Sequence, residues 1–68
     1  MNIVFEQLHQ SRTTGVPVKL YKQLWRVEQY EPSPVPGGIE HQFHLVLENP
    51  GTSIDRVDMV VRIHQHEV

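Results

Sequence analysis

The sequence predicts an all-β fold, a small antiparallel meander, from two observations. Apolar and polar residues alternate over segments that are too short for amphipathic helices. Clusters of Pro, Gly, Asn, Ser and Thr, residue types that end regular elements, separate these segments at 13–17, 32–38 and 49–53. We therefore expect three core strands, near 23–31, 39–48 and 54–66.

The last segment has the clearest pattern of a half-buried strand. Its odd positions are apolar, namely Val57, Met59, Val61 and Ile63. Its even positions are polar apart from Val60, namely Arg56, Asp58, Arg62, His64 and His66. The middle segment alternates in the same way, with Phe43, Leu45 and Leu47 on one face, and in the first segment Trp25 and Val27 share a face.

Charge and apolar matching predict a register for the three strands, because a slip of one residue would move every side chain to the other face. Turns centred near Gly51 and Val35 give two core layers, Trp25–Leu45–Val57 and Val27–Phe43–Met59. The same register gives two polar rows on the outer face, Arg26–His44–Asp58 and Tyr30–Glu40–Arg62. Opposite charges then lie side by side across the strands.

A three-stranded sheet with one apolar face needs a cover, which the segment before residue 23 has to supply. In one solution, Ile3–Leu8 and Val16–Lys22 add strands, and the sheet closes into a small barrel similar in layout to SH3-like barrels. In the other, two subunits pack their apolar faces together as a dimeric sandwich. The N-terminal segment is alternatively a short helix, because Val4 and Leu8 would share a face, although no convincing cap precedes it.

Length and composition limit the possible classes of protein. We expect 68 residues to form one small domain, 1–68, of marginal stability. The chain has no cysteine, which excludes disulfides and thiolate zinc sites, and its net charge of −2 argues against a dedicated nucleic-acid binder. With no targeting segment and no apolar run long enough to cross a bilayer, we expect a soluble cytoplasmic protein without a membrane partner or a cofactor.

His64 and His66 are the one weak candidate for a metal site. On a strand both point the same way, about 6.6 Å apart, so both could reach one zinc ion. A stable site needs a third or fourth ligand, and the predicted register keeps His44 and His41 away from this pair. We therefore predict two solvated histidines at the end of a strand and no physiological metal.

An enzyme is not expected. The predicted register places Asp58 beside His44, with Arg26 beyond, but it places no Ser nucleophile beside them and leaves no cleft on the outer face. A cross-strand row of charges explains the same residues. Gly37 and Gly38 form a turn, since they lack the Lys-Ser/Thr and the following helix of a phosphate-binding loop.

Binding is the function that the sequence favours. Small β-barrels can hold single-stranded nucleic acid on aromatic and basic residues. Here such a surface would consist of Lys19, Tyr21, Lys22, Arg26 and Tyr30. A stiff loop that displays Val35 between prolines, and an edge strand left open, indicate protein contacts instead. We expect a non-enzymatic interaction or adaptor module that binds a protein partner or itself as a homo-oligomer, with nucleic acid as the alternative. The candidate binding residues are Tyr21, Lys22, Arg26, Tyr30, Val35, His44 and Arg62.

Overall fold

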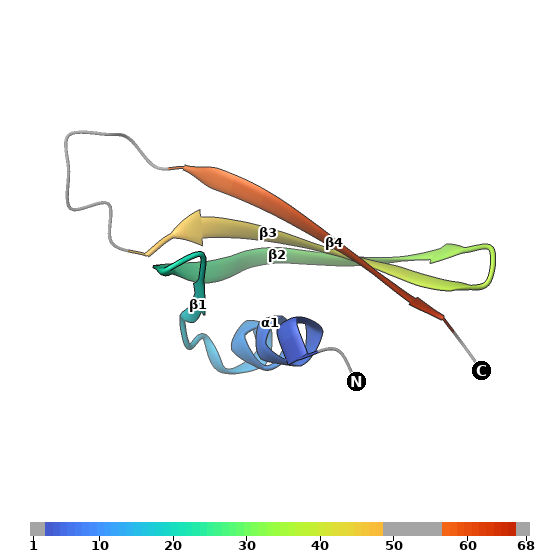
Figure 1. The fold of residues 1–68 in the computed structure, drawn as a ribbon, viewed down its shortest axis with the longest axis horizontal. Helices are drawn as coiled ribbons and strands as arrows, with labels where there is room; N and C mark the ends of the chain where they lie inside the picture. The colour runs from blue at the N-terminus through green and yellow to red at the C-terminus, as the bar shows by residue number, and fades with distance from the viewer. Residues whose placement is uncertain (1–2, 49–56, 67–68) are drawn as a thin grey trace.

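The fold is a small curled antiparallel sheet with one short helix, a half-barrel, as the alternation predicts (Figure 1). The computed structural model describes residues 3–48 and 57–66. The elements are α1 (Ile3–Thr14), β1 (Val18–Leu20), β2 (Gln23–Val35), β3 (Gly38–Leu47) and β4 (Asp58–His66). The strands lie in the order β1-β2-β3-β4. The turn predicted at 49–53 and residues 54–56 of the predicted last strand lie outside the described part.

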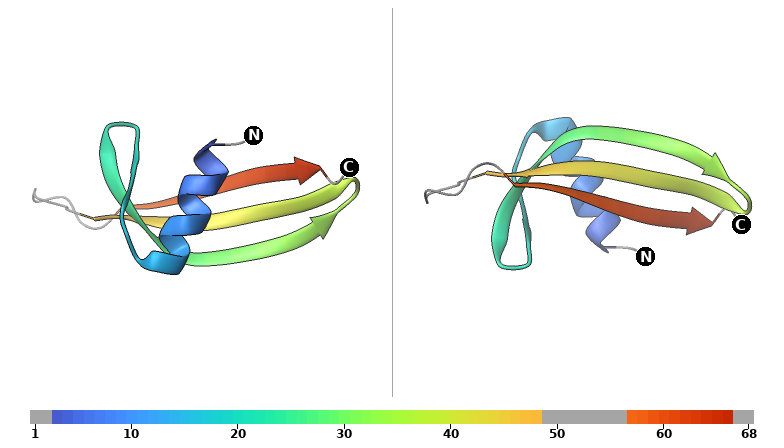
Figure 2. Two further views of the ribbon diagram at one scale, coloured as in Figure 1. Left: turned by 90° about the horizontal axis from the view of Figure 1, so that it is seen from below. Right: turned by 90° about the horizontal axis from the view of Figure 1, so that it is seen from above.

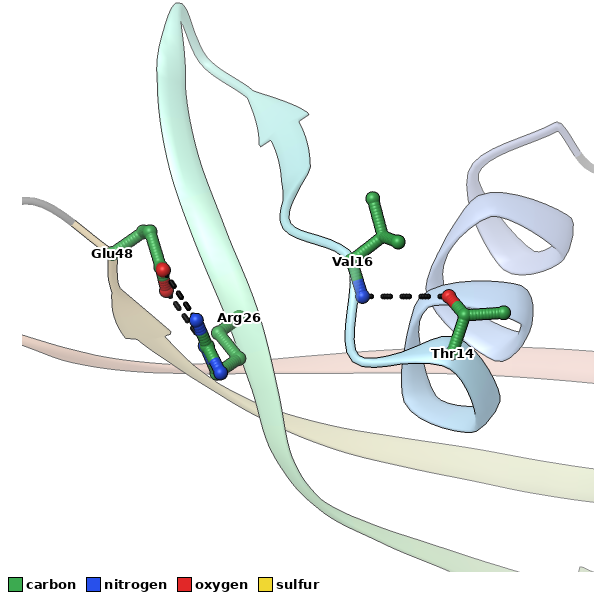
Figure 3. Close-up of polar contacts among 4 residues, drawn as sticks. All are labelled: Thr14, Val16, Arg26 and Glu48. Carbon is green, nitrogen blue, oxygen red and sulfur yellow. Dashed lines mark hydrogen bonds and ion pairs between the residues drawn. The ribbon is translucent and has the colours of Figure 1, made fainter.

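The N-terminal segment is a helix, so the strand considered over Ile3–Leu8 is wrong. Helix α1 ends in a glycine cap: Gly15 has a φ of +75°, and its amide donates to the Ser11 carbonyl oxygen at 2.8 Å. The Val16 amide then donates to Thr14 Oγ1 at 3.3 Å, which Figure 3 shows beside the last turn. The cluster at 13–17 therefore terminates a helix.

Helix α1 covers one face of the sheet and supplies the missing cover from within the chain. Leu8 is fully buried in the core, and the Phe5 ring packs edge-on against Phe43 with centroids 6.0 Å apart. Figure 2 shows the helix crossing the sheet, with its N-terminal end extending past β4. The helix occupies the face that a dimeric sandwich would need.

The second predicted N-terminal strand is present but shorter than expected, as β1. A tight turn joins it to β2, and its central residues Tyr21 and Lys22 have φ values of +53° and +62°. Positive φ at both central residues is the type I′ geometry, which matches the twist of a hairpin. The Trp25 indole N–H donates to the Leu20 carbonyl oxygen at 3.0 Å and ties the hairpin to the core.

Strand β2 continues beyond residue 31, so the loop predicted over 32–38 is mostly wrong. Val35 still pairs with Gly38 across a two-residue turn of Pro36 and Gly37. Gly37 has a φ of +86°, and Pro followed by such a Gly fits a type II turn. Gly38 has to be small, because a Cβ there would collide with the Gln65 backbone of β4.

Two prolines lie inside β2 because their nitrogens point away from β3. The Leu47 amide donates to the carbonyl oxygen of Val57, the residue before β4. Backbone groups alternate in direction along an antiparallel strand, so those of His41 and Ile39 also point toward β4 and away from β2. Pro32 and Pro34 are opposite these two residues on β2. They therefore face the outer edge, where a missing N–H costs no ladder hydrogen bond.

The observed register differs from the predicted one by two residues along β3 and β4. Leu45 is opposite Met59, and Trp25 is opposite Leu47. A shift of two keeps the side chains of β3 and β4, and those of β2 before residue 28, on their predicted faces, although the predicted layers are wrong. Between β2 and β3 the shift arises because their turn is centred one to two residues later than predicted.

A β-bulge in β2, where the pairing changes between Val27 and Gln29, reverses the faces of the residues after it. Tyr30 therefore lies opposite Phe43 on the core face, and its predicted place on the outer face is wrong. The outer rows are Arg26–Val46–Asp58, Gln29–His44–Val60, Glu31–Gln42–Arg62 and Ser33–Glu40–His64.

The core lies between α1 and the sheet. Its buried apolar members are Leu8, Val18, Trp25, Phe43, Leu45 and Ile63. Partly buried side chains extend it toward both edges, namely Phe5, Leu20, Val27, Tyr30, Leu47, Met59 and Val61. In the described ranges, no helix has the length and apolar character needed to cross a membrane.

Candidate interaction edge

The predicted binding residues do not form one site. Arg26, His44 and Arg62 lie on the outer face, on three successive strands. Tyr21 and Lys22 form the β1–β2 turn, where Tyr21 is 80% exposed. Val35 lies at the opposite end of β2 and Tyr30 on the other face, so the structure divides the set among four places.

Arg26 makes an ion pair with Glu48, a residue that sequence reasoning did not select. The Arg26 Nε donates to Glu48 Oε2 at 2.7 Å, and Nη2 donates to Oε1 (Figure 3). This hydrogen bond is the main reason that the pKa of Glu48 is lowered and the pKa of Arg26 is raised. Arg26 is therefore engaged within the sheet, which weakens its predicted role in holding a phosphate.

The His44–Asp58 pair considered for acid–base chemistry is not formed as predicted. His44 is opposite Val60, and Asp58 is opposite Val46. The His44 ring instead accepts a hydrogen bond from Gln42 Nε2 at 2.9 Å. The geometry gives no nucleophile and base in contact at this position.

A partly buried chain of polar contacts joins Tyr30, His41 and Gln65, with His41 at its buried centre. Tyr30 Oη lies 2.6 Å from His41 Nδ1, and His41 Nε2 lies 3.0 Å from Gln65 Oε1. The His41 tautomer with its hydrogen on Nε2 fits both contacts, accepting from Tyr30 and donating to Gln65. Because His41 is only 6% exposed and packs against Phe5, it lies within the core of the protein.

His64 and His66 lie side by side on the outer face of β4, with ring centroids 4.9 Å apart. His66 Nδ1 donates to the Gly37 carbonyl oxygen at 3.3 Å, and Glu40 is opposite His64. Within residues 3–48 and 57–66, no group of three or more His, Cys, Asp or Glu side chains is placed to hold a metal ion.

A shallow groove of about 460 Å³ lies between α1 and β1. The helix lines it with Gln7, Gln10, Ser11 and Thr14, and the segment 16–19 forms the other wall. Lys19 is the one ionisable side chain among these residues. The Ser11 hydroxyl is buried and has no hydrogen-bond partner in the described part of the chain. Such walls offer an amphipathic surface without paired acid–base groups.

The far edge of the sheet is the feature that most resembles a binding site. Strand β4 pairs with β3 on one side only, and no described strand lies on its other side. Since the residue before β4 bonds to β3, the alternation of the ladder turns the backbone groups of Asp58, Val60 and Arg62 outward. His64 and His66 continue this outward series.

This edge has the properties of a strand that can accept another. It is nine residues long, and the segment 58–66 contains no proline, glycine or lysine. Val60, at its outer face, is 43% exposed. Unpaired outward N–H and C=O groups on a strand of this length are a template for addition of a further strand.

Comparison with known proteins leaves the function to be argued from the molecule itself. The chain matches no family model, no curated protein and no solved structure.

Sequence reasoning recognised the possibility of an open edge but did not assign it to β4. The signal was available: prolines two apart, at 32 and 34, mark outward positions of one strand, while 58–66 lacks proline. The Tyr30–His41 contact was not predictable, because it depends on the bulge in β2.

Proposed function

We propose that this protein is a small non-enzymatic interaction module that binds another polypeptide by strand addition at the outer edge of β4. The single observation that carries the proposal is that no described strand lies beside the outer edge of β4, a strand nine residues long and without proline. Main-chain hydrogen bonds supply affinity in this mode of recognition, and alternate side chains supply specificity.

The other edge of the sheet supports this assignment by contrast. Strand β2 is covered by β1 at Gln23–Trp25, interrupted by its bulge, and lacks donors at Pro32 and Pro34. These features are known protections against edge pairing. Their concentration on one edge leaves β4 as the place where a strand can add.

The test uses an eight-residue peptide of alternating threonine and valine with a lysine at each end, added at millimolar concentration and followed by amide NMR. Strand addition should shift and protect the amides of Val60 and Arg62. The Val60→Pro variant removes one outward donor but no bond to β3, and it should abolish the effect. Unchanged Val60 and Arg62 amides in the unmodified protein, at a concentration where it is monomeric, would overturn the proposal.

A further inference from the structure

The charges along β4 identify a specific occupant for its edge. Asp58 and Arg62 lie on the same face of the strand, two positions on either side of Val60. A second copy paired antiparallel about Val60 would place Asp58 opposite Arg62 of that copy, twice by symmetry. We propose that β4 pairs with β4 of a second copy in this register, an inference that rests on the strand-addition function above.

The backbone of β4 fits the same centre. Val57 accepts a hydrogen bond from Leu47 of β3. Because backbone groups alternate in direction, the N–H and C=O groups of Asp58, Val60 and Arg62 point to the open edge. Pairing about Val60 therefore matches outward groups with outward groups at all three positions. Centring the pairing on Asp58 or on Arg62 would set like charges opposite each other, which is unfavourable.

The core face also continues across the proposed seam. In this register Met59 is opposite Val61 of the second copy, and Val61 is opposite Met59 of that copy. Both side chains are only half-buried within one chain and already pack against its core. Pairing therefore joins two apolar faces side by side and removes more apolar surface from water.

The N-terminal end of α1 supplies a second contact. Phe5 packs against Phe43 and His41, whose partners on β4 are Val61 and Ile63. The helix therefore crosses β4 near these two residues, and its end extends past the edge of the strand (Figure 2).

This projecting end is apolar, and so is the surface that it would meet. Ile3 and Val4, at the start of α1, are 64% and 40% exposed. In the proposed register Ile63 is opposite Val57 of the second copy, a residue that is 41% exposed in one chain. Each helix end would then cover the start of the other copy's β4, which explains apolar exposure at both places.

Cysteine cross-linking tests the register, because the chain contains no cysteine of its own. In the proposed pair the two copies of residue 60 have Cα atoms about 5.5 Å apart, within disulfide reach. Val60→Cys should therefore form a disulfide dimer under mild oxidation at micromolar concentration.

Two matched variants make the test specific. Two copies of residue 58, or of residue 62, are offset by four residues, about 13 Å, so Asp58→Cys and Arg62→Cys should each remain monomeric on oxidation. An equal mixture of the two should give the mixed disulfide, because residue 58 is then opposite residue 62. Equal cross-linking of all three single variants, or none by Val60→Cys, would overturn the inference.

The outcome also separates this inference from the proposed function. If Val60→Cys fails to cross-link while the threonine–valine peptide still adds to β4, the second copy is not the occupant and the edge retains its function. If the peptide also fails to add, both proposals fall.

Discussion

The two edges of the sheet differ in three properties that govern strand addition. The β2 edge carries a short covering strand, a bulge and two prolines at outward positions, whereas β4 presents nine uninterrupted residues. Edge protection in this chain costs little stability, because Pro32 and Pro34 occupy positions where β3 needs no donor. The comparison teaches that the open edge of β4 is a selective feature of the sheet rather than a general result of its small size.

The largest expected effect comes from proline in β4, and its size depends on whether the lost amide points toward β3 or toward the open edge. Val61→Pro removes an inward donor to β3 and leaves a carbonyl of Phe43 unsatisfied, which should lower the free energy of unfolding by about 1–3 kcal/mol. Val60→Pro removes only an outward donor and should cost much less. Urea denaturation of both variants measures the difference; equal losses would contradict the assignment of inward and outward groups.

The second-largest effect should come from removing the prolines that protect the edge of β2, which should increase the size of the oligomers. Replacing both Pro32 and Pro34 by Thr restores two outward donors, and Thr is favoured in strands. With both edges open, pairing can continue without closing, so we expect larger species to form. Sedimentation velocity measures this change. As a control, adding Val60→Pro to the same variant should remove these larger species, and growth that persists there would contradict the role of β4.

Reversing the charges on β4 should alter the dimer by a smaller factor. Asp58→Arg and Arg62→Asp each set like charges opposite each other at two symmetric places. Exposed pairs contribute roughly 0.2–1 kcal/mol each, and two pairs are lost, so either variant should weaken dimerisation by about 2- to 30-fold. Combining both changes should restore it. Sedimentation equilibrium at low salt measures the dissociation constants, and failure of the double variant to recover would exclude this register.

The smallest expected effect concerns the ion pair between Arg26 and Glu48, just before the bulge of β2. The pKa of Glu48 is lowered in the folded protein, mainly by its hydrogen bond from Arg26. Its stabilising contribution is therefore fully present above the pKa of the unfolded chain and is lost as pH falls through the lower folded value. In Arg26→Gln, NMR titration should show the pKa of Glu48 returning upward; an unchanged pKa would mean that another group holds it down.

The fold class and the core-facing residues of β3 and β4 were predictable from alternation alone. Phe43, Leu45 and Met59 lie on the face that the sequence assigns to them. The layers were not predictable, since a two-residue shift preserves every face and satisfies the same pattern. The length of β2 through Pro34 and the turn at Pro36–Gly37 fix the register of β2 against β3.

The helix and the bulge required information that alternation does not contain. Helix α1 has few apolar residues on its buried face, but Gly15 followed by Pro17 is a recognisable helix stop. The bulge near Glu28 has no comparable signal. It moves Tyr30 from the outer face into the core, and with it one residue of the candidate binding set.

The candidate edge itself was partly readable. The sequence shows Val60 with Asp58 and Arg62 two positions away on either side. This pattern indicates an edge for pairing only if β4 is the last strand of the sheet. That place in the sheet follows from the three-dimensional strand order.

The most direct test of the account is amide hydrogen exchange of the unmodified protein at two concentrations, resolved by residue. We predict that the outward amides of Val60 and Arg62 become protected as concentration rises, while the outward amide of Tyr30 on β2 does not change. Equal behaviour of the two edges, or rapid exchange at Val60 and Arg62 at every concentration, would contradict the claim that β4 is the edge through which this protein binds.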